Sequence, residues 1–94
     1  MGFEWDDFQE AINRQKRGIT FNDAASAFGD PLHLEEGSAR PEYGEERRKA
    51  IGMVQDRIVT VIFTIRQDQH RIISARKARP DERQRYNDQS TTTA

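Results

Sequence analysis

The sequence predicts an α+β domain: an N-terminal strand and two helices, an antiparallel meander of three or four strands, and a C-terminal helix packed with the others on one face of the sheet. Two observations carry this prediction. Apolar residues recur at helical spacing in the first third of the chain. The run Arg57–Arg66 is rich in β-branched residues, which favour a central strand.

The first element predicted is a short strand, because Phe3-Glu4-Trp5 alternates apolar and polar residues. Asp6 is a suitable N-cap for a helix from about Asp7 to Arg17, and Gly18 is a suitable residue to end it. The side chains expected to form the buried stripe are Trp5, Phe8, Ala11 and Ile12.

A second helix is predicted to begin at Thr20, which with Asp23 resembles a capping box. Its apolar residues are spaced i, i+3, i+4 and i+7, as on one face of a helix: Phe21, Ala24, Ala25 and Phe28. Gly29-Asp30-Pro31 is expected to end this helix.

The predicted sheet follows. Leu32–Leu34 can begin a strand, and Glu35–Tyr43 is typical of an exposed turn or loop. Arg47–Val54 is expected to be extended, and Gln55-Asp56 provides a tight connection into the central strand.

Gln67–Gln69 then returns the chain into a strand over His70–Ala75. Pro80 suits the first turn of a helix that runs to about Asn87. We therefore expect one domain over residues 1–88 and a flexible polar tail over residues 89–94.

Strand alternation predicts which face of the strand carries Arg76. It sets Ile72, Ser74 and Arg76 on one face and Arg71, Ile73, Ala75 and Lys77 on the other. Arg76 is then anchored beside the core, with further cations in the helix that follows. Such a cluster indicates a phosphate site. The alternative is a charged helix that only faces solvent.

Composition narrows the chemistry. The 94 residues include no cysteine, which excludes disulfides and thiolate chemistry. The two histidines, His33 and His70, have no paired ligand spacing, so no metal cofactor is predicted. The first residues do not resemble a signal peptide, and no apolar run has the length of a membrane span. These features predict a soluble, cytoplasmic protein.

The net charge of −1 hides a division along the chain. Residues 1–46 contain 4 Lys/Arg and 11 Asp/Glu, whereas residues 47–86 contain 11 Lys/Arg and 4 Asp/Glu. A division of this kind predicts a basic face for an anionic partner.

Five segments in the same order resemble the BrnT family of type II toxin-antitoxin ribonucleases, which has a RelE-like fold. They are Phe3-Glu4-Trp5-Asp6; Asn13 with Lys16 and Gly18; Phe28-Gly29-Asp30-Pro31; Gly44-Glu45-Glu46-Arg47 with Ile51-Gly52; and Ile72-Ile73-Ser74-Ala75-Arg76 with Glu82, Arg83 and Tyr86. Three positions depart from the family pattern. Gln9 stands in place of lysine, Arg17 in place of histidine, and Arg79 in place of a capping Thr or Ser.

The resemblance implies a metal-independent endoribonuclease that inhibits translation, with or without the ribosome. It also implies a BrnA-like ribbon-helix-helix antitoxin as partner, through which the toxin reaches operator DNA indirectly. The alternative is a non-catalytic module that holds nucleic acid or acts as a co-repressor.

Metal-free RNA cleavage needs cations around the phosphate, together with a general base and a general acid. Arg47, Arg66 and Arg76 lie on or at the ends of successive predicted strands, so we expect them to converge on one phosphate. Lys16 is expected to add a fourth cation, and Glu45 is a candidate base. The expected RNA-binding rim consists of Lys77, Arg79, Arg83 and Tyr86, although the Tyr86 ring has packing on the sheet as its alternative.

Overall fold

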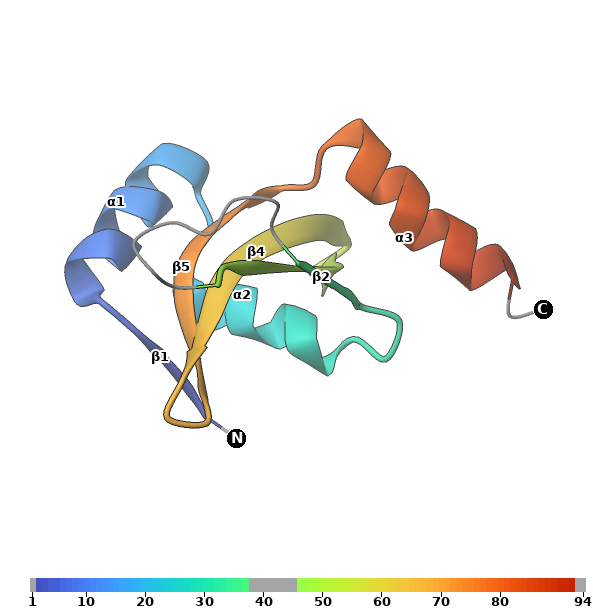
Figure 1. Cartoon of the computed structure of the whole chain (residues 1–94). Coiled ribbons are helices and arrows are strands. Elements are labelled where there is room, and N and C mark those ends of the chain that lie inside the picture. The colour runs from blue at the N-terminus through green and yellow to red at the C-terminus, as the bar shows by residue number, and fades with distance from the viewer. Residues whose placement is uncertain (1, 38–45, 93–94) are drawn as a thin grey trace.

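The computed structural model describes residues 2–37 and 46–92, with the backbone alone for residues 90–92, and this part of the chain forms one sheet flanked by helices (Figure 1). The elements in chain order are β1 (Phe3–Trp5), α1 (Asp7–Arg17), α2 (Phe21–Ala25), the 3₁₀ turn η1 (Ser26–Gly29), β2 (Leu34–Gly37), β3 (Arg48–Val54), β4 (Arg57–Arg66), β5 (Gln69–Lys77) and α3 (Pro80–Thr92). The predicted α+β class is confirmed.

The strands of the sheet are ordered β1-β5-β4-β3-β2, so the predicted central strand, β4, lies in the middle. Strands β2 to β5 are antiparallel, whereas β1 runs parallel to β5 with Phe3 opposite His70. The β3–β4 and β4–β5 hairpins each turn through two residues with positive φ, Gln55-Asp56 and Gln67-Asp68. Positive φ at both positions matches the right-handed twist of the flanking strands.

One face of the sheet holds the main core. The buried members of this cluster are Ile19, Phe21, Ala24, Ala27, Ala50, Val54, Val59, Val61, Phe63, Ile72 and Ala75. Helix α2 and η1 pack closely on this face, and Gly52 permits the approach. A Cβ at Gly52 would lie 2.7 Å from the carbonyl oxygen of Ala27, so any larger residue would push η1 away from β3.

The predicted caps of α1 are confirmed, but its predicted buried stripe is wrong in part: Trp5 packs against the main core, whereas Phe8 and Ile12 do not. Asp6 accepts hydrogen bonds from the backbone of Phe8 and Gln9, and Gly18 ends the helix at φ 71°. Phe8 is 75% exposed and Ile12 41% exposed. β1 pairs with β5 only at residues 70–72, so α1 contacts the rest of that edge, and its inward-facing residues are polar: Asn13 is buried and Glu10 accepts a hydrogen bond from the backbone N–H of Phe21.

A polar side chain fixes α1 to this edge. Asn13 is buried, and its Oδ1 accepts a hydrogen bond from the backbone N–H of Ala75 at 3.1 Å. Its Nδ2 donates to the carbonyl of Ile19, also at 3.1 Å. Asn13 therefore joins strand β5, helix α1 and the loop that follows the helix.

A bulge in β5 corrects the predicted alternation. Ser74 is opposite Ile62 but Ile72 is opposite Phe63, so Ile73 is an extra residue in the pairing. The extra residue turns both Ile72 and Ala75 toward the main core. Arg71, Ser74 and Arg76 therefore lie together on the opposite face, which we call the open face.

Helix α3 packs on the open face, so the prediction that all helices share one face is wrong. Ile51, Ala78 and Tyr86 form a second apolar cluster there. Ile51 follows Ala50 of the main core directly, and neighbouring residues of a strand point to opposite faces.

Two predicted boundaries also change. Helix α3 continues to Thr92, beyond its predicted end at about Asn87, and Gln89 donates a hydrogen bond to the carbonyl of Leu32. Strand β2 takes up Glu35–Gly37 of the predicted loop because it pairs with β3, and residues 38–45 lie outside the described residues. Across the described ranges no helix is long and apolar enough to cross a membrane.

The double role of Asn13 gives a test of the edge contact. We expect Asn13→Ala to lower the free energy of unfolding by about 2 kcal/mol or more, because it strands a buried N–H and a buried carbonyl. Urea denaturation measures the change. The control Asn22→Ala, at an exposed position of α2, should change stability by less than about 0.5 kcal/mol. Equal midpoints for the two variants would contradict this role of Asn13.

Candidate functional site

The carboxylate of Glu82 is fully buried beneath the N-terminus of α3 and is surrounded by donors. Arg76 binds it with two nitrogens, at 2.8 and 3.0 Å. Lys49 donates at 2.9 Å and the hydroxyl of Thr60 at 3.0 Å. The backbone N–H of Arg79 completes the set at 2.8 Å, which is the return half of a capping box for α3.

These contacts decide the protonation state of Glu82. Burial by itself would raise the pKa of this carboxyl. The hydrogen bonds from Arg76, the Arg79 backbone, Lys49 and Thr60 outweigh burial and hold the pKa of Glu82 well below its usual range. Glu82 is therefore an anion that neutralises two cations of the open face.

Arg76, the leading candidate from sequence, is one of those two cations. Its guanidinium makes a two-nitrogen pair with Glu82 and also donates to the carbonyl of Lys77. The side chain is only 17% exposed. Its position beside the core is as the sequence predicted, but its planar donor edge is occupied by a carboxylate of its own chain.

Tyr86 is also used inside the protein. The residue is 5% exposed and belongs to the second apolar cluster, and its hydroxyl donates to Asp30 at 2.5 Å. Burial, together with this hydrogen bond, raises the pKa of Tyr86 to about 12. Asp30 also accepts from the backbone of Leu32 and Met53, so it ties the η1–β2 loop to β3 and α3. The ring is packed on the sheet, the alternative to stacking on a base.

Three arginines line a cleft of about 150 Å³ at the end of the sheet beside β1, which we call the arginine cleft. Its lining residues are Asp6, Gln9, Arg47, Arg66, Arg71 and Ile73. Arg47 and Arg66 thus meet, as the strand ends suggested. Arg71, which sequence reasoning did not select, joins them because of the bulge, and it also pairs with Glu4 at 2.8 Å.

Arg76 does not join this group, so the predicted convergence of Arg47, Arg66 and Arg76 is wrong. Arg76 is opposite Thr60, six residues along β4 from Arg66. At ~3.3 Å per residue this separation is roughly 20 Å. Arginines that share a sheet face are therefore divided between its two ends.

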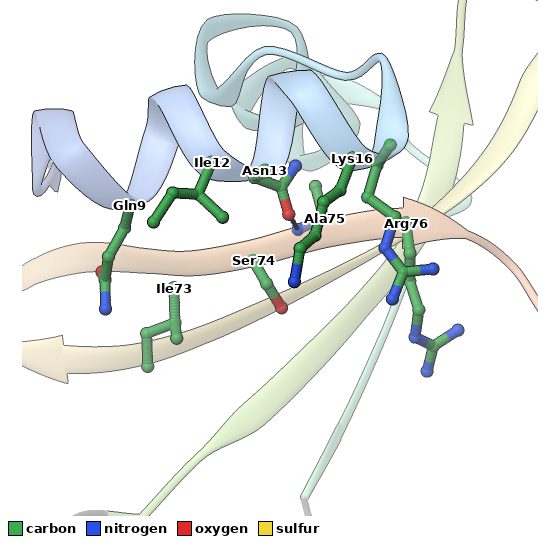
Figure 2. Close-up of a pocket in the computed structure, with 9 residues that line it drawn as sticks. Gln9, Ile12, Asn13, Lys16, Ile73, Ser74, Ala75 and Arg76 are labelled. Atoms are coloured by element: carbon green, nitrogen blue, oxygen red, sulfur yellow. Dashed lines mark hydrogen bonds between the residues drawn. The ribbon is translucent and has the colours of Figure 1, made fainter.

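A second cleft, of about 220 Å³, lies between α1 and β5, and we call it the α1–β5 cleft. Its lining residues are Gln9, Ile12, Asn13, Lys16, Arg17, Ile73, Ser74, Ala75 and Arg76. Gln9, Ile12, Asn13 and Lys16 project from one side of α1 toward β5 (Figure 2). Gln9 and Ile73 line both clefts, so the two adjoin. Gln9 and Arg17, which depart from the family pattern, both lie here.

The expected rim lies elsewhere. Lys77 and Arg83 line a third cleft, of about 290 Å³, with Arg57 and the β3–β4 turn. Arg79 is exposed at the start of α3, where its backbone serves Glu82. The rim residues thus surround the N-terminus of α3 and do not border the arginine cleft. Sequence reasoning missed Arg57 because it read that residue only as the start of a strand.

The division of charge along the chain is partly cancelled in the fold. The edge strands β1 and β2 carry acidic residues and pair with basic strands. Glu4 binds Arg71, Glu35 lies 3.9 Å from Arg48, and Glu36 binds Arg85 at 2.7 Å. These ion pairs therefore neutralise part of the predicted basic face. Lys16 and Arg17 form no ion pair within residues 2–37 and 46–92.

General bases are scarce near these clefts. Both histidines lie on the main-core side around Phe28, and neither lines a cleft described above. Burial lowers the pKa of His70, which favours its neutral form. Glu45, the candidate base from sequence, lies outside the described residues. Asp6 is the carboxylate of the arginine cleft, where its Oδ1 caps α1.

Adjoining clefts lined with Lys and Arg along one edge of an α+β sheet define a protein suited to bind a polyanion such as nucleic acid. A family model for the ribonuclease toxin BrnT of type II toxin-antitoxin systems matches residues 5–82. The chain therefore belongs to the BrnT family of ribonuclease toxins. Membership of a type II system implies an antitoxin partner. No curated protein matches the chain.

The low pKa of Glu82 makes stability depend on pH. A carboxyl whose pKa is depressed by folding contributes stability above its unfolded pKa, near the usual value of 4.5, and loses that contribution as the pH falls. At pH 7 we expect Glu82→Gln to lower the free energy of unfolding by about 3 kcal/mol, because Arg76 and Lys49 lose their anion.

We expect the difference in unfolding free energy between the wild type and Glu82→Gln to decrease steadily below about pH 4.5. Urea denaturation at several pH values measures it. The control is Asp7→Asn, an exposed change in the first turn of α1. Its free energy of unfolding should differ little from that of the wild type at every pH. A difference in unfolding free energy for Glu82→Gln that does not change with pH would contradict the charged network around Glu82.

Proposed function

We propose that the chain is a metal-independent endoribonuclease with a RelE-like fold that cleaves RNA and inhibits translation in the cytoplasm. A BrnA-like antitoxin neutralises it and connects it to operator DNA. Family membership supports the ribonuclease class. The observation that carries the proposal is the meeting of Arg47, Arg66 and Arg71 in one cleft of about 150 Å³.

The proposed reaction places the scissile phosphate among these arginines. A general base removes the proton of the ribose 2′-OH, the 2′ oxygen attacks phosphorus, and the 5′ oxygen leaves after it receives a proton. Negative charge grows on the phosphate oxygens during attack. Guanidinium groups already fixed around them stabilise that charge without reorganisation.

We propose two candidate general bases and one further cation around this phosphate. Asp6 and Glu45 are the candidate bases: Asp6 lies in the arginine cleft, and Glu45 is two residues before Arg47. Lys16 lies in the adjoining cleft and supplies a further cation. In this proposal Arg76 is a positioning residue that holds α3 in place through Glu82.

A second candidate function is a module that binds nucleic acid, or acts as a co-repressor, without cleavage. Two observations favour it. The guanidinium of Arg76 is occupied by Glu82, and no histidine lines any of the three clefts described above. Such a module keeps the cations that bind phosphate but lacks a proton acceptor.

RNA cleavage in the presence of EDTA separates the two candidates. Purified protein is incubated with RNA, and the products are resolved on a gel. Cleavage that EDTA does not change supports the proposed enzyme. Intact, protected RNA supports the binding module, and cleavage that disappears with EDTA contradicts metal independence.

Arg66 tests the arginine cleft without disturbing Glu82. We expect Arg66→Ala to lower the cleavage rate by about 100-fold, because a fixed cation at the phosphate is lost. It should also relieve growth arrest. The matched control is Arg14→Ala on α1, whose 57% exposed side chain lies 3.5 Å from Glu10 outside the clefts. Equal loss of activity in both variants would contradict a specific role for the arginine cleft.

A further inference from the structure

We propose that the apolar middle of the α1–β5 cleft binds one unpaired nucleobase, so that the RNA is single-stranded where it crosses this cleft. This inference rests on the proposed function. The base-binding residues are Gln9, Ile12, Ile73 and Ser74, which we call the waist.

The walls of the waist are apolar although they face solvent. Ile12 is 41% exposed on α1, and Ile73 is only partly buried on β5. Both line the same cleft from facing elements. Ile73 is the extra residue of the bulge, which takes it out of the regular pairing of β5. Two apolar side chains across a cleft suit the flat faces of an aromatic ring.

Gln9, at one end of the waist, and Ser74, on β5, carry polar groups that can form hydrogen bonds with the edge of a base. The Gln9 amide has both donors and an acceptor, and the Ser74 hydroxyl can serve as either. In Figure 2, Gln9 and Lys16 project from α1 in the direction of β5, where Ser74 lies. Unstacked bases are recognised through such contacts to their edges, together with contacts to their faces.

Positive charge lies at both ends of the waist. Arg47, Arg66 and Arg71 lie beyond Gln9 and Ile73, while Lys16 and Arg17 lie at the other end. Gln9 and Lys16 are seven residues apart on α1, which is roughly 10 Å along the helix. This arrangement suits a polyanion whose phosphates flank one inserted base. Charge complementarity therefore favours nucleic acid over an apolar protein segment.

The size of the cleft favours a single ring system. Its volume of about 220 Å³ is below the ~300 Å³ of the smallest pockets for drug-sized ligands. A base inside a duplex is stacked and paired, so it cannot present its faces to Ile12 and Ile73. The cleft can therefore discriminate between single-stranded and duplex RNA.

The test is a binding experiment with RNA that cannot be cleaved. Three fluorescent probes with 2′-O-methyl riboses are compared by anisotropy: a short single strand, the same strand with one abasic position, and a hairpin duplex. The abasic position is moved along the strand in a series. The test variant is Ile12→Ser and the control is Ile65→Ser, since Ile65 is similarly exposed, at 45%, outside the clefts described.

We expect Ile12→Ser to bind the intact single strand about tenfold more weakly than the wild type does, and Ile65→Ser to bind it equally well. One abasic position should weaken wild-type binding by a similar factor. The same abasic strand should bind Ile12→Ser and wild type alike, because the contact is already lost. The duplex should bind more weakly than the single strand.

Three outcomes would overturn the inference. The first is equal affinity of the wild type for the duplex and the single strand. The second is wild-type binding that no abasic position weakens. The third is an Ile12→Ser variant that binds RNA as tightly as the wild type does. In the last case, a weaker antitoxin complex with Ile12→Ser would assign the waist to a protein partner. Because the probes lack a free 2′-OH, these results are independent of cleavage. If the protein does not cleave ordinary RNA, the proposed enzyme is rejected. The proposed base site is then accepted or rejected from the binding data alone.

Discussion

The buried carboxylate of Glu82 is the interaction on which the arrangement of the open face depends. It collects donors from three neighbouring strands, Lys49 on β3, Thr60 on β4 and Arg76 on β5. It also accepts the backbone N–H that begins α3. A buried anion without these partners would be strongly unfavourable, so the strands and the helix are held in one geometry. The contact of Tyr86 with Asp30 fixes α3 further along its length.

This network also divides the cations by role. Arg76 and Lys49 are counter-ions of Glu82, and Arg85 pairs with Glu36 and Asp81. They hold α3 on the sheet. Arg47 and Arg66 lie at the other end of the sheet, away from α3, where the proposed chemistry takes place. Loss of activity on changing Arg76 would therefore report the position of α3 as well as any contact with RNA, whereas Arg66 can be changed without disturbing Glu82.

The bulge at Ile73 and the short pairing of β1 together produce the clefts. β1 covers only residues 70–72 of β5, and α1 takes the edge beyond them through Asn13. The bulge turns Arg71 and Arg76 to the same face and frees Ile73 from the regular pairing. A helix held by the polar side chains of Asn13 and Glu10 rather than by an apolar stripe leaves Ile12 at the surface. The exposed apolar wall of the waist follows from that attachment.

The sequence by itself determined the α+β class, the caps of α1, the tight hairpin turns, the central strand and the family. These depend on local patterns such as periodicity, capping residues and turn residues, which act over a few positions. Only the tertiary structure decided which cations meet. Glu82 lies 33 residues from Lys49 along the chain, and Glu4 lies 67 residues from Arg71. One extra residue in a strand reverses which side chains share a face, and no local pattern marks its position.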